Sequence, residues 1–151
     1  MKSEVKKVSS FNIAVDVLVL TLFEDEKIEE SAAIQDINIC LHGKILDLVK
    51  NKEITGKFDE MTVLYGYGEL QAKKVLITGL GKKKTFSTDR LRHVAGSAVR
   101  QAKRLHAKKM GLKFRAYVLK ILQNDGIIIP HLLIIQTGFC RTQLVRYSLI
   151  T

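Results

Sequence analysis

The strongest indication of the fold comes from Lys74-Val-Leu-Ile-Thr-Gly-Leu-Gly-Lys82 and from Leu91-Arg-His-Val-Ala-Gly-Ser-Ala-Val-Arg100, which follows after a short gap. Residues 75–78 are aliphatic or β-branched, which predicts a strand. Gly79-Leu-Gly81 predicts a tight loop, and the second stretch predicts a helix. A strand, a glycine-containing loop and a helix in this order are typical of a layered α/β domain.

The predicted helix has an N-terminal signal and one apolar face. Ser87 or Thr88 is a suitable N-cap, and Asp89 places a negative charge in the first turn. The apolar residues recur at helical spacing: Leu91, Val94, Ala95, Ala98, Val99, Ala102 and Leu105. Basic residues occupy the remaining surface: Arg90, Arg92, Arg100, Lys103 and Arg104. The sequence therefore predicts a helix over about residues 89–106 with a basic outer face.

Upstream of this unit, the pattern predicts one strand and one long helix. Residues 11–23 are rich in Val, Ile and Leu, which is typical of a strand buried on both faces of a sheet. From Ser31 the apolar residues recur every three or four positions. This spacing predicts one amphipathic helix that runs to about Lys50, with Gly43 as its weak point.

A hairpin and a further strand follow. Residues 61–65 and 74–78 predict two strands joined by a turn that contains Gly66 and Gly68. Alternating apolar residues over 109–118 predict another strand.

Beyond about residue 120 the pattern is less regular. Residues 123–126 predict a turn, and residues 127–135 predict a strand interrupted at Pro130.

Length and composition predict one globular domain. The chain has 151 residues, of which 46% are hydrophobic and 26% charged. No apolar run approaches the roughly 20 residues of a membrane-spanning helix, and the N-terminus lacks a clear signal-peptide pattern. Cys40 and Cys140 have no metal-ligand spacing, which favours two buried thiols in a reducing compartment. We therefore expect a cytoplasmic protein without a membrane anchor.

The net charge of +10 is unevenly distributed. Residues 1–70 carry 8 basic and 13 acidic residues, whereas residues 71–120 carry 15 basic residues and 1 acidic residue. Such asymmetry suits an anionic ligand, nucleic acid or an acidic partner surface. The alternative is a solvated basic face that meets an acidic surface in a larger assembly.

An anion site is one hypothesis for Gly79, Gly81 and Lys82, because backbone amides before a helix can bind an anion. The spacing matches neither common glycine-rich signature. Lys83 stands where a Walker loop has Ser or Thr, and Lys84 stands where a dinucleotide-binding loop has its third glycine. The alternative is a plain strand-to-helix turn.

The sequence contains no visible catalytic or metal-binding constellation. Its four histidines are scattered, no HExxH run is present, and the acids fall mostly in the first 70 residues. A basic surface of Arg92, Arg100, Lys103 and Arg104 would permit nucleic-acid binding. Against this interpretation, aromatic residues are not interleaved with the charges, and no nucleic-acid-binding signature is present.

The order of these segments resembles the N-terminal domain of the leucyl (cytosol) aminopeptidase family. The resemblance covers roughly residues 11–111. It rests on Asp16-Val-Leu-Val-Leu-Thr-Leu-Phe-Glu24, His42-Gly-Lys-Ile-Leu-Asp-Leu-Val49, Gly56-Lys-Phe58 and the two stretches quoted first. None of these segments is a catalytic motif, so the resemblance identifies a domain and not an active site.

This resemblance implies a three-layer α/β/α domain with a mixed sheet, related to macro domains. In the family such a domain packs beside a C-terminal catalytic domain and contributes to hexamer assembly. Whole members remove N-terminal residues from peptides with two divalent metals, zinc or manganese among them, which the other domain holds. The hallmark of that domain, an Asn-Thr-Asp-Ala-Glu-Gly-Arg run, does not occur in this sequence. We therefore expect no catalytic residue and no metal ligand on this chain.

These expectations divide the chain into three segments. Residues 1–10 form an N-terminal extension, residues 11–120 the aminopeptidase-like α/β domain, and residues 121–151 a tail that departs from the family pattern. We hypothesise that the tail results from truncation or a frame shift, which reading the gene past residue 112 in the other frames would test. A natural stand-alone domain with a divergent tail is the competing explanation.

The function expected from the resemblance is that of a non-catalytic assembly or regulatory domain. Its partners would be the catalytic domain of the parent enzyme and further copies of the chain. The alternative is a stand-alone macro-domain-like module that binds an anionic ligand near Gly79, Gly81 and Lys82, or nucleic acid on the basic helix.

Overall fold

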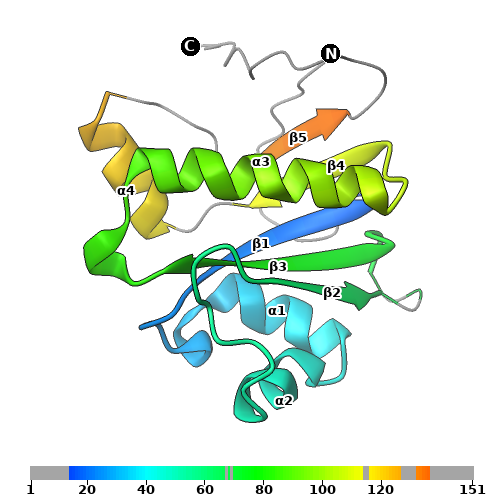
Figure 1. Ribbon diagram of the computed structural model, residues 1–151. Helices are drawn as coiled ribbons and strands as arrows, with labels where there is room; N and C mark the ends of the chain where they lie inside the picture. Colours follow the sequence, from blue (N-terminus) through cyan, green and yellow to red (C-terminus); the bar gives the residue numbers. More distant parts are fainter. Residues whose placement is uncertain (1–13, 67, 69, 114–115, 127–131, 137–151) are drawn as a thin grey trace.

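The computed structural model describes residues 14–66, 68, 70–113, 116–126 and 132–136 (Figure 1). Within these residues five strands form one sheet, in the order β2-β3-β1-β4-β5. The strands are β1 (Val17–Phe23), β2 (Met61–Tyr65), β3 (Lys74–Gly81), β4 (Lys109–Lys113) and β5 (Leu132–Gln136). β1 is parallel to β3 and β4, whereas β2 and β5 are antiparallel to their neighbours. The expected mixed sheet is confirmed.

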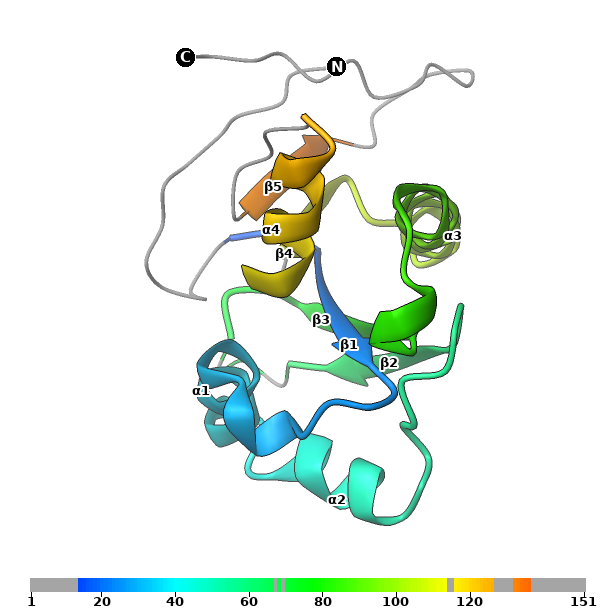
Figure 2. The same cartoon turned by 90° about the vertical axis from the view of Figure 1, so that its left-hand side faces the viewer.

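Helices cover both faces of this sheet, as Figure 2 shows. They are α1 (Ala32–Cys40), α2 (Lys44–Lys50), α3 (Thr88–Arg104) and α4 (Ala116–Asn124), with two short 3-10 turns, η1 (Ile28–Glu30) and η2 (Lys83–Thr85). One buried cluster joins α1 and α2 to the sheet, and a second cluster joins α3 and α4 to the opposite face. The expected three-layer α/β/α architecture is confirmed.

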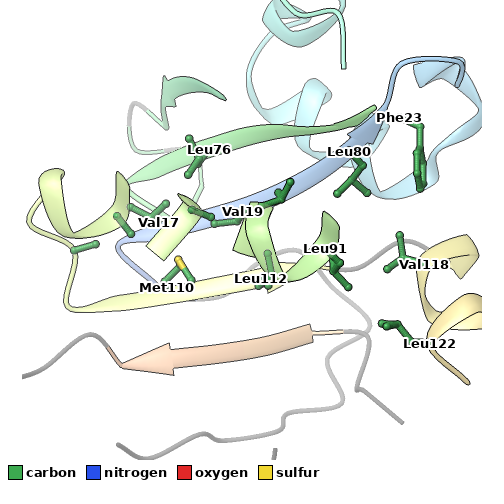
Figure 3. Close-up of a cluster of buried hydrophobic side chains, with 14 residues drawn as sticks. Val17, Val19, Phe23, Leu76, Leu80, Leu91, Met110, Leu112, Val118 and Leu122 are labelled. Atoms are coloured by element: carbon green, nitrogen blue, oxygen red, sulfur yellow. The ribbon is translucent and has the colours of Figure 1, made fainter. Parts of the chain in front are cut away.

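The central strand β1 explains why its sequence is almost continuously apolar. Val17, Val19 and Phe23 pack on the α3 side, in the cluster drawn in Figure 3. Leu18, Leu20 and Leu22 pack on the α1 side. Successive side chains of a strand point to opposite faces, so a strand between two helical layers buries both sets. All seven residues of β1 are buried.

The basic helix α3 matches its sequence pattern closely. The Ser87 hydroxyl accepts a hydrogen bond from the Arg90 amide at 3.3 Å and caps the N-terminus. Four residues of the predicted apolar face are buried: Leu91, Val94, Ala98 and Ala102. The predicted antiparallel pairing of residues 61–65 with 74–78 is also confirmed.

The prediction of one continuous helix from Ser31 to Lys50 is wrong. The chain forms α1 and α2, and it turns between them at His42 (φ 54°) and Gly43 (φ 79°). The apolar spacing persists because Ile37 and Ile45, on the two sides of the turn, pack in the same cluster. Periodicity therefore identified the buried face correctly and missed the turn.

Three strand boundaries also differ from the predictions. Among the described residues, the strand predicted over 11–23 begins at Val17. Gly79-Leu-Gly81 is the end of β3 and not a loop. The strand predicted over 109–118 ends at Lys113, and Val118 lies in α4, where it packs on the α3 side of the sheet. An amphipathic helix placed directly after a strand continues the apolar pattern, which concealed the boundary.

The expected domain boundary at residue 120 falls inside α4. The turn predicted at 123–126 coincides with the end of this helix, and Gly126 has a φ of 76°. Residues 132–136 form β5 and pair antiparallel with β4, whereas residues 127–131 lie outside the described residues, Pro130 among them. Part of the expected tail thus belongs to the sheet.

Candidate functional site

The predicted anion site lies where the carboxyl end of β3 meets the loop of residues 55–60. The Gly79 amide donates to the Glu60 carbonyl at 2.9 Å, and the Gly81 amide donates to the Gly56 carbonyl at 3.0 Å. Both amides therefore already have acceptors within the protein. A phosphate at this position would have to displace the loop, so the anion site gains no support from these two groups and stays a prediction.

Close approach of the loop explains why glycine occupies these positions. A Cβ atom at Gly79 would overlap the Lys57 carbonyl oxygen. A Cβ atom at Gly56 would lie 2.8 Å from the Phe23 backbone. Gly81 has a φ of 77°, a conformation that side chains other than glycine rarely adopt. The glycines thus allow three segments of backbone to pack together.

Two carboxylates of the chain itself contact the segment of three consecutive lysines, residues 82–84. The Lys83 amide donates to the two oxygens of Asp25 at 3.2 and 3.3 Å. The Lys83 ammonium lies 3.8 Å from Glu26 Oε1. The anionic groups that contact Lys83 are carboxylates of the chain itself, so binding of an external anion at Gly79, Gly81 and Lys82 stays a prediction. Lys82 remains exposed at the surface beside this contact.

The predicted basic surface is exposed along the outer side of α3. Arg92, Arg100, Lys103 and Arg104 are all exposed. Arg92 forms an ion pair with Asp89 at 3.1 Å, and Arg100 donates to the Ser97 hydroxyl at 2.8 Å. These two contacts lie within the helix and are accessible to water. Such exposed contacts contribute little free energy, so an acidic partner could replace them at low cost.

The structure adds an aromatic residue to this surface that the sequence did not indicate. The Phe58 ring is 39% exposed. The centroid of this ring lies 4.7 Å from Arg90 Cζ and 5.3 Å from the centroid of the His93 ring. His93 Nε2 also lies 3.1 Å from Asp59 Oδ2. These contacts join residues that are far apart in the sequence, so no local pattern could have revealed them.

One further basic group lies at the carboxyl end of β4. Burial lowers the pKa of the Lys113 ammonium, and the charge of Asp36 partly opposes this shift.

Within the part of the chain that the structure describes, no group of three or more His, Cys, Asp or Glu side chains could hold a metal ion. Cys40 is a half-buried free thiol rather than a fully buried one, and Cys140 lies outside the described residues.

The sheet and its helical layers define a macro-domain-like α/β/α domain. The macrodomain of Mycobacterium tuberculosis DarG superposes with a TM-score of 0.57 at 11% identity, over 82% of this chain and 91% of that chain. A mutant of tomato leucine aminopeptidase superposes with a TM-score of 0.60 at 16% identity, over 72% of this chain and 22% of that chain. At these identities the likeness concerns the fold alone.

Sequence comparison gives the family. The family model described as "Cytosol aminopeptidase family, N-terminal domain" matches residues 19–121, from β1 into α4. This chain belongs to the cytosol aminopeptidase family, through its N-terminal domain. The expected resemblance is confirmed.

Two relatives illustrate the extent of the match. The probable cytosol aminopeptidase of Geobacter sulfurreducens is 40% identical over 80 residues, which are 53% of this chain and 16% of that protein. The corresponding protein of Alkaliphilus oremlandii is 29% identical over 112 residues, which are 74% of this chain and 22% of that protein. The chain therefore spans about a fifth of the length of these relatives.

No described helix is long and apolar enough to cross a membrane.

Proposed function

We propose that this chain serves as a non-catalytic N-terminal domain of a cytosol aminopeptidase, with a role in assembly or regulation. The observation that carries the proposal is the family match over residues 19–121. That region includes most of β1, all of β2, β3 and β4, the helices α1, α2 and α3, and the first part of α4. Four of the five described strands thus lie wholly or mostly within the N-terminal domain of the family, and β5 lies beyond the matched region.

In this proposal the peptidase chemistry belongs to another domain. The parent enzyme removes N-terminal residues from peptides, and its catalytic domain holds the zinc or manganese ions. The domain described here acts in the cytoplasm, where it contacts that catalytic domain and further copies of the chain. No catalytic residue and no metal ligand is assigned to this chain.

A first experiment measures release of a chromogenic leucine amide by the purified chain, with manganese or zinc added. We expect no turnover above that of a buffer control. The matched positive control is the full-length Geobacter sulfurreducens relative under the same conditions. Turnover by the chain that requires metal and survives further purification would contradict the proposal.

A second experiment tests the domain role directly. In the same relative, the N-terminal domain is replaced by residues 19–121 of this chain, the region that the family model matches. We expect the chimera to fold, to assemble like the parent and to hydrolyse leucine amide, whereas the parent with this segment deleted should not assemble normally. A folded chimera that neither assembles nor works would contradict the domain role.

A second candidate function is binding of an anionic ligand or of nucleic acid at α3. The observation that favours it is the exposed Phe58 ring, held between Arg90 and His93 at one end of the basic surface. A basic helix beside an exposed aromatic ring can bind phosphate groups and stack on a base.

This candidate is tested with a labelled oligothymidylate at several salt concentrations. If it is correct, affinity falls steeply as salt rises, and Lys103→Glu weakens binding more than Lys50→Glu, a matched charge reversal on the opposite layer. Equal effects of the two substitutions, or no binding at low salt, would exclude it.

A further inference from the structure

β2 forms one edge of the sheet, as Figure 1 shows. Two hydrogen bonds at its ends determine which of its backbone groups face β3. The Gly66 amide donates to the Lys73 carbonyl at 3.0 Å, and the Gly79 amide donates to the Glu60 carbonyl at 2.9 Å. Positions 60 and 66 therefore both direct backbone groups toward β3.

The alternation of an antiparallel ladder extends this assignment along the strand. Hydrogen-bonded and non-hydrogen-bonded positions alternate, so Thr62 and Leu64 also direct their backbone groups toward β3. The N–H and C=O groups of Met61, Val63 and Tyr65 consequently face the open edge. No strand among the described residues pairs with them.

This edge lacks the features that usually prevent pairing with another strand. Natural sheet edges are commonly protected by charged residues, proline or a bulge within the strand. The sequence of β2 is Met-Thr-Val-Leu-Tyr, which contains no charge and no proline. Tyr65 is 52% exposed at the end of the strand. An uncharged edge of five residues is well suited to pair with a further strand.

The symmetry of the outward groups points to a second copy of the same strand. We propose that β2 pairs antiparallel with β2 of a second copy, about a two-fold axis at Val63. Val63 then faces Val63 of the second copy, and Met61 faces Tyr65 of the second copy. All three outward positions of each strand are hydrogen-bonded in this register, which gives about six intermolecular hydrogen bonds. Such a contact is self-complementary and closes after two copies.

The charges that flank β2 are compatible with this pairing. Asp59 and Glu60 precede the strand, and Lys73 and Lys74 lie beside its far end. Each of these charged groups also has a partner within its own chain, so pairing of the two copies adds a longer-range attraction and not a new ion pair. Antiparallel pairing brings the acidic end of one copy beside the lysine end of the other. In addition, the exposed Tyr65 ring of one copy would cover Met61 of the other copy, a residue that is half-buried in the single chain. The dimer would contain one continuous sheet of ten described strands, five from each copy.

The first test is sedimentation of the whole chain over a range of concentrations. We expect a monomer–dimer equilibrium. Val63→Pro should raise the dissociation constant at least about tenfold, because it removes both hydrogen bonds of the central pair. The ladder to β3 keeps its hydrogen bonds, since the Val63 amide faces outward. Val63→Thr, which keeps the amide and the β-branch, is the matched control and should dimerise like the unaltered chain.

A second measurement needs no substitution. Amide hydrogen exchange, followed residue by residue by NMR, should slow at Met61, Val63 and Tyr65 as the protein concentration rises. The amides of Thr62 and Leu64, which face β3, should be protected at every concentration. A chain that stays monomeric, a dimer that survives Val63→Pro, or exchange at Val63 that ignores concentration would each overturn the proposal.

Discussion

Two threonine hydroxyls lie buried in the sheet beneath α3. Thr21 and Thr78 are neighbours on β1 and β3, and they are 2% and 0% exposed. Among the described residues neither Oγ1 atom has a hydrogen-bond partner. A buried hydroxyl without a partner costs about 1–3 kcal/mol relative to one in water. These two residues are therefore points of local instability within an otherwise apolar core.

We expect Thr78→Val to raise the free energy of unfolding by about 1 kcal/mol, because it removes an unpaired hydroxyl with little change in shape. Chemical denaturation monitored by circular dichroism measures this effect. The control is Thr55→Val, whose hydroxyl donates to Glu60 at 3.0 Å and whose loss should destabilise the domain. A lower stability of Thr78→Val would mean that its hydroxyl has a partner, such as a buried water.

Asp16 holds the beginnings of three strands together. One carboxylate oxygen accepts hydrogen bonds from the Lys108 and Lys109 amides at 2.8 and 3.0 Å, and the other lies 3.1 Å from the Lys73 ammonium. The Lys109 amide above all, followed by the Lys108 amide and Lys73, lowers the pKa of Asp16 below its usual 3.8, although partial burial opposes the shift.

This depressed pKa predicts a specific pH dependence of stability. The contribution of Asp16 is complete above the unfolded pKa near 3.8 and is lost as pH falls through the lower folded pKa, because the unfolded chain then binds more protons. Asp16→Asn should cost about 2 kcal/mol at neutral pH, and the difference from the unaltered chain should shrink below about pH 4. Urea denaturation at several pH values measures it.

A control separates the amide contacts of Asp16 from its ion pair. The Lys73 side chain is 76% exposed, so Lys73→Ala should change stability by less than about 1 kcal/mol. If Lys73→Ala were as damaging as Asp16→Asn, the ion pair and not the amides would be the source of the stability.

At the scale of elements, the turn between α1 and α2 depends on Asn38. Its Oδ1 atom accepts hydrogen bonds from the Ile45 and Leu46 amides at 3.0 and 3.2 Å. Gly43, at the N-cap position of α2, supplies no side chain for this purpose. The 7%-exposed Asn38 side chain of one helix thus caps the first turn of the next.

We expect Asn38→Ala to lower the free energy of unfolding by about 1–3 kcal/mol, because it leaves two amides without an acceptor. Thermal or urea unfolding measures the change. Asn51→Ala, at an exposed position after α2, is the matched control and should change stability by less than about 0.5 kcal/mol. Equal stability of Asn38→Ala and the unaltered chain would show that α2 does not need this cap.

At the scale of the whole molecule, the end of the domain can be located by a single side chain. Leu122 lies beyond the expected boundary at residue 120, yet it is 1% exposed and packs in the α3-side cluster (Figure 3). β5 also lies beyond that boundary and continues the sheet. The domain therefore extends past residue 120.

Leu122→Ala should destabilise the whole domain by about 2–5 kcal/mol, because it opens a cavity beside α3. The control is the neighbouring Gln123→Ala, at an exposed position of the same helix, which should have little effect. Denaturation curves of both variants make the comparison. A silent Leu122→Ala would mean that residues after 120 form a dispensable tail.

The buried faces of the domain and its family could be predicted from the amino-acid sequence. The apolar run of β1, the stripe of α3 and the cap at Ser87 were all predictable, because strand and helix periodicity and N-cap chemistry are local properties. The pairing of β2 with β3 followed from two short strands and a glycine turn. The exposed basic residues of α3 followed from the same helical spacing.

Other features of the domain depend on contacts between segments that are distant in the sequence. The turn at Gly43 depends on the Asn38 cap, and the role of Gly79 depends on the backbone of residues 56 and 57. The position of Phe58 beside Arg90, and of Asp25 against Lys83, likewise joins distant parts of the chain. Such contacts form only when packing brings separate segments together, so the sequence pattern within any one segment does not predict them.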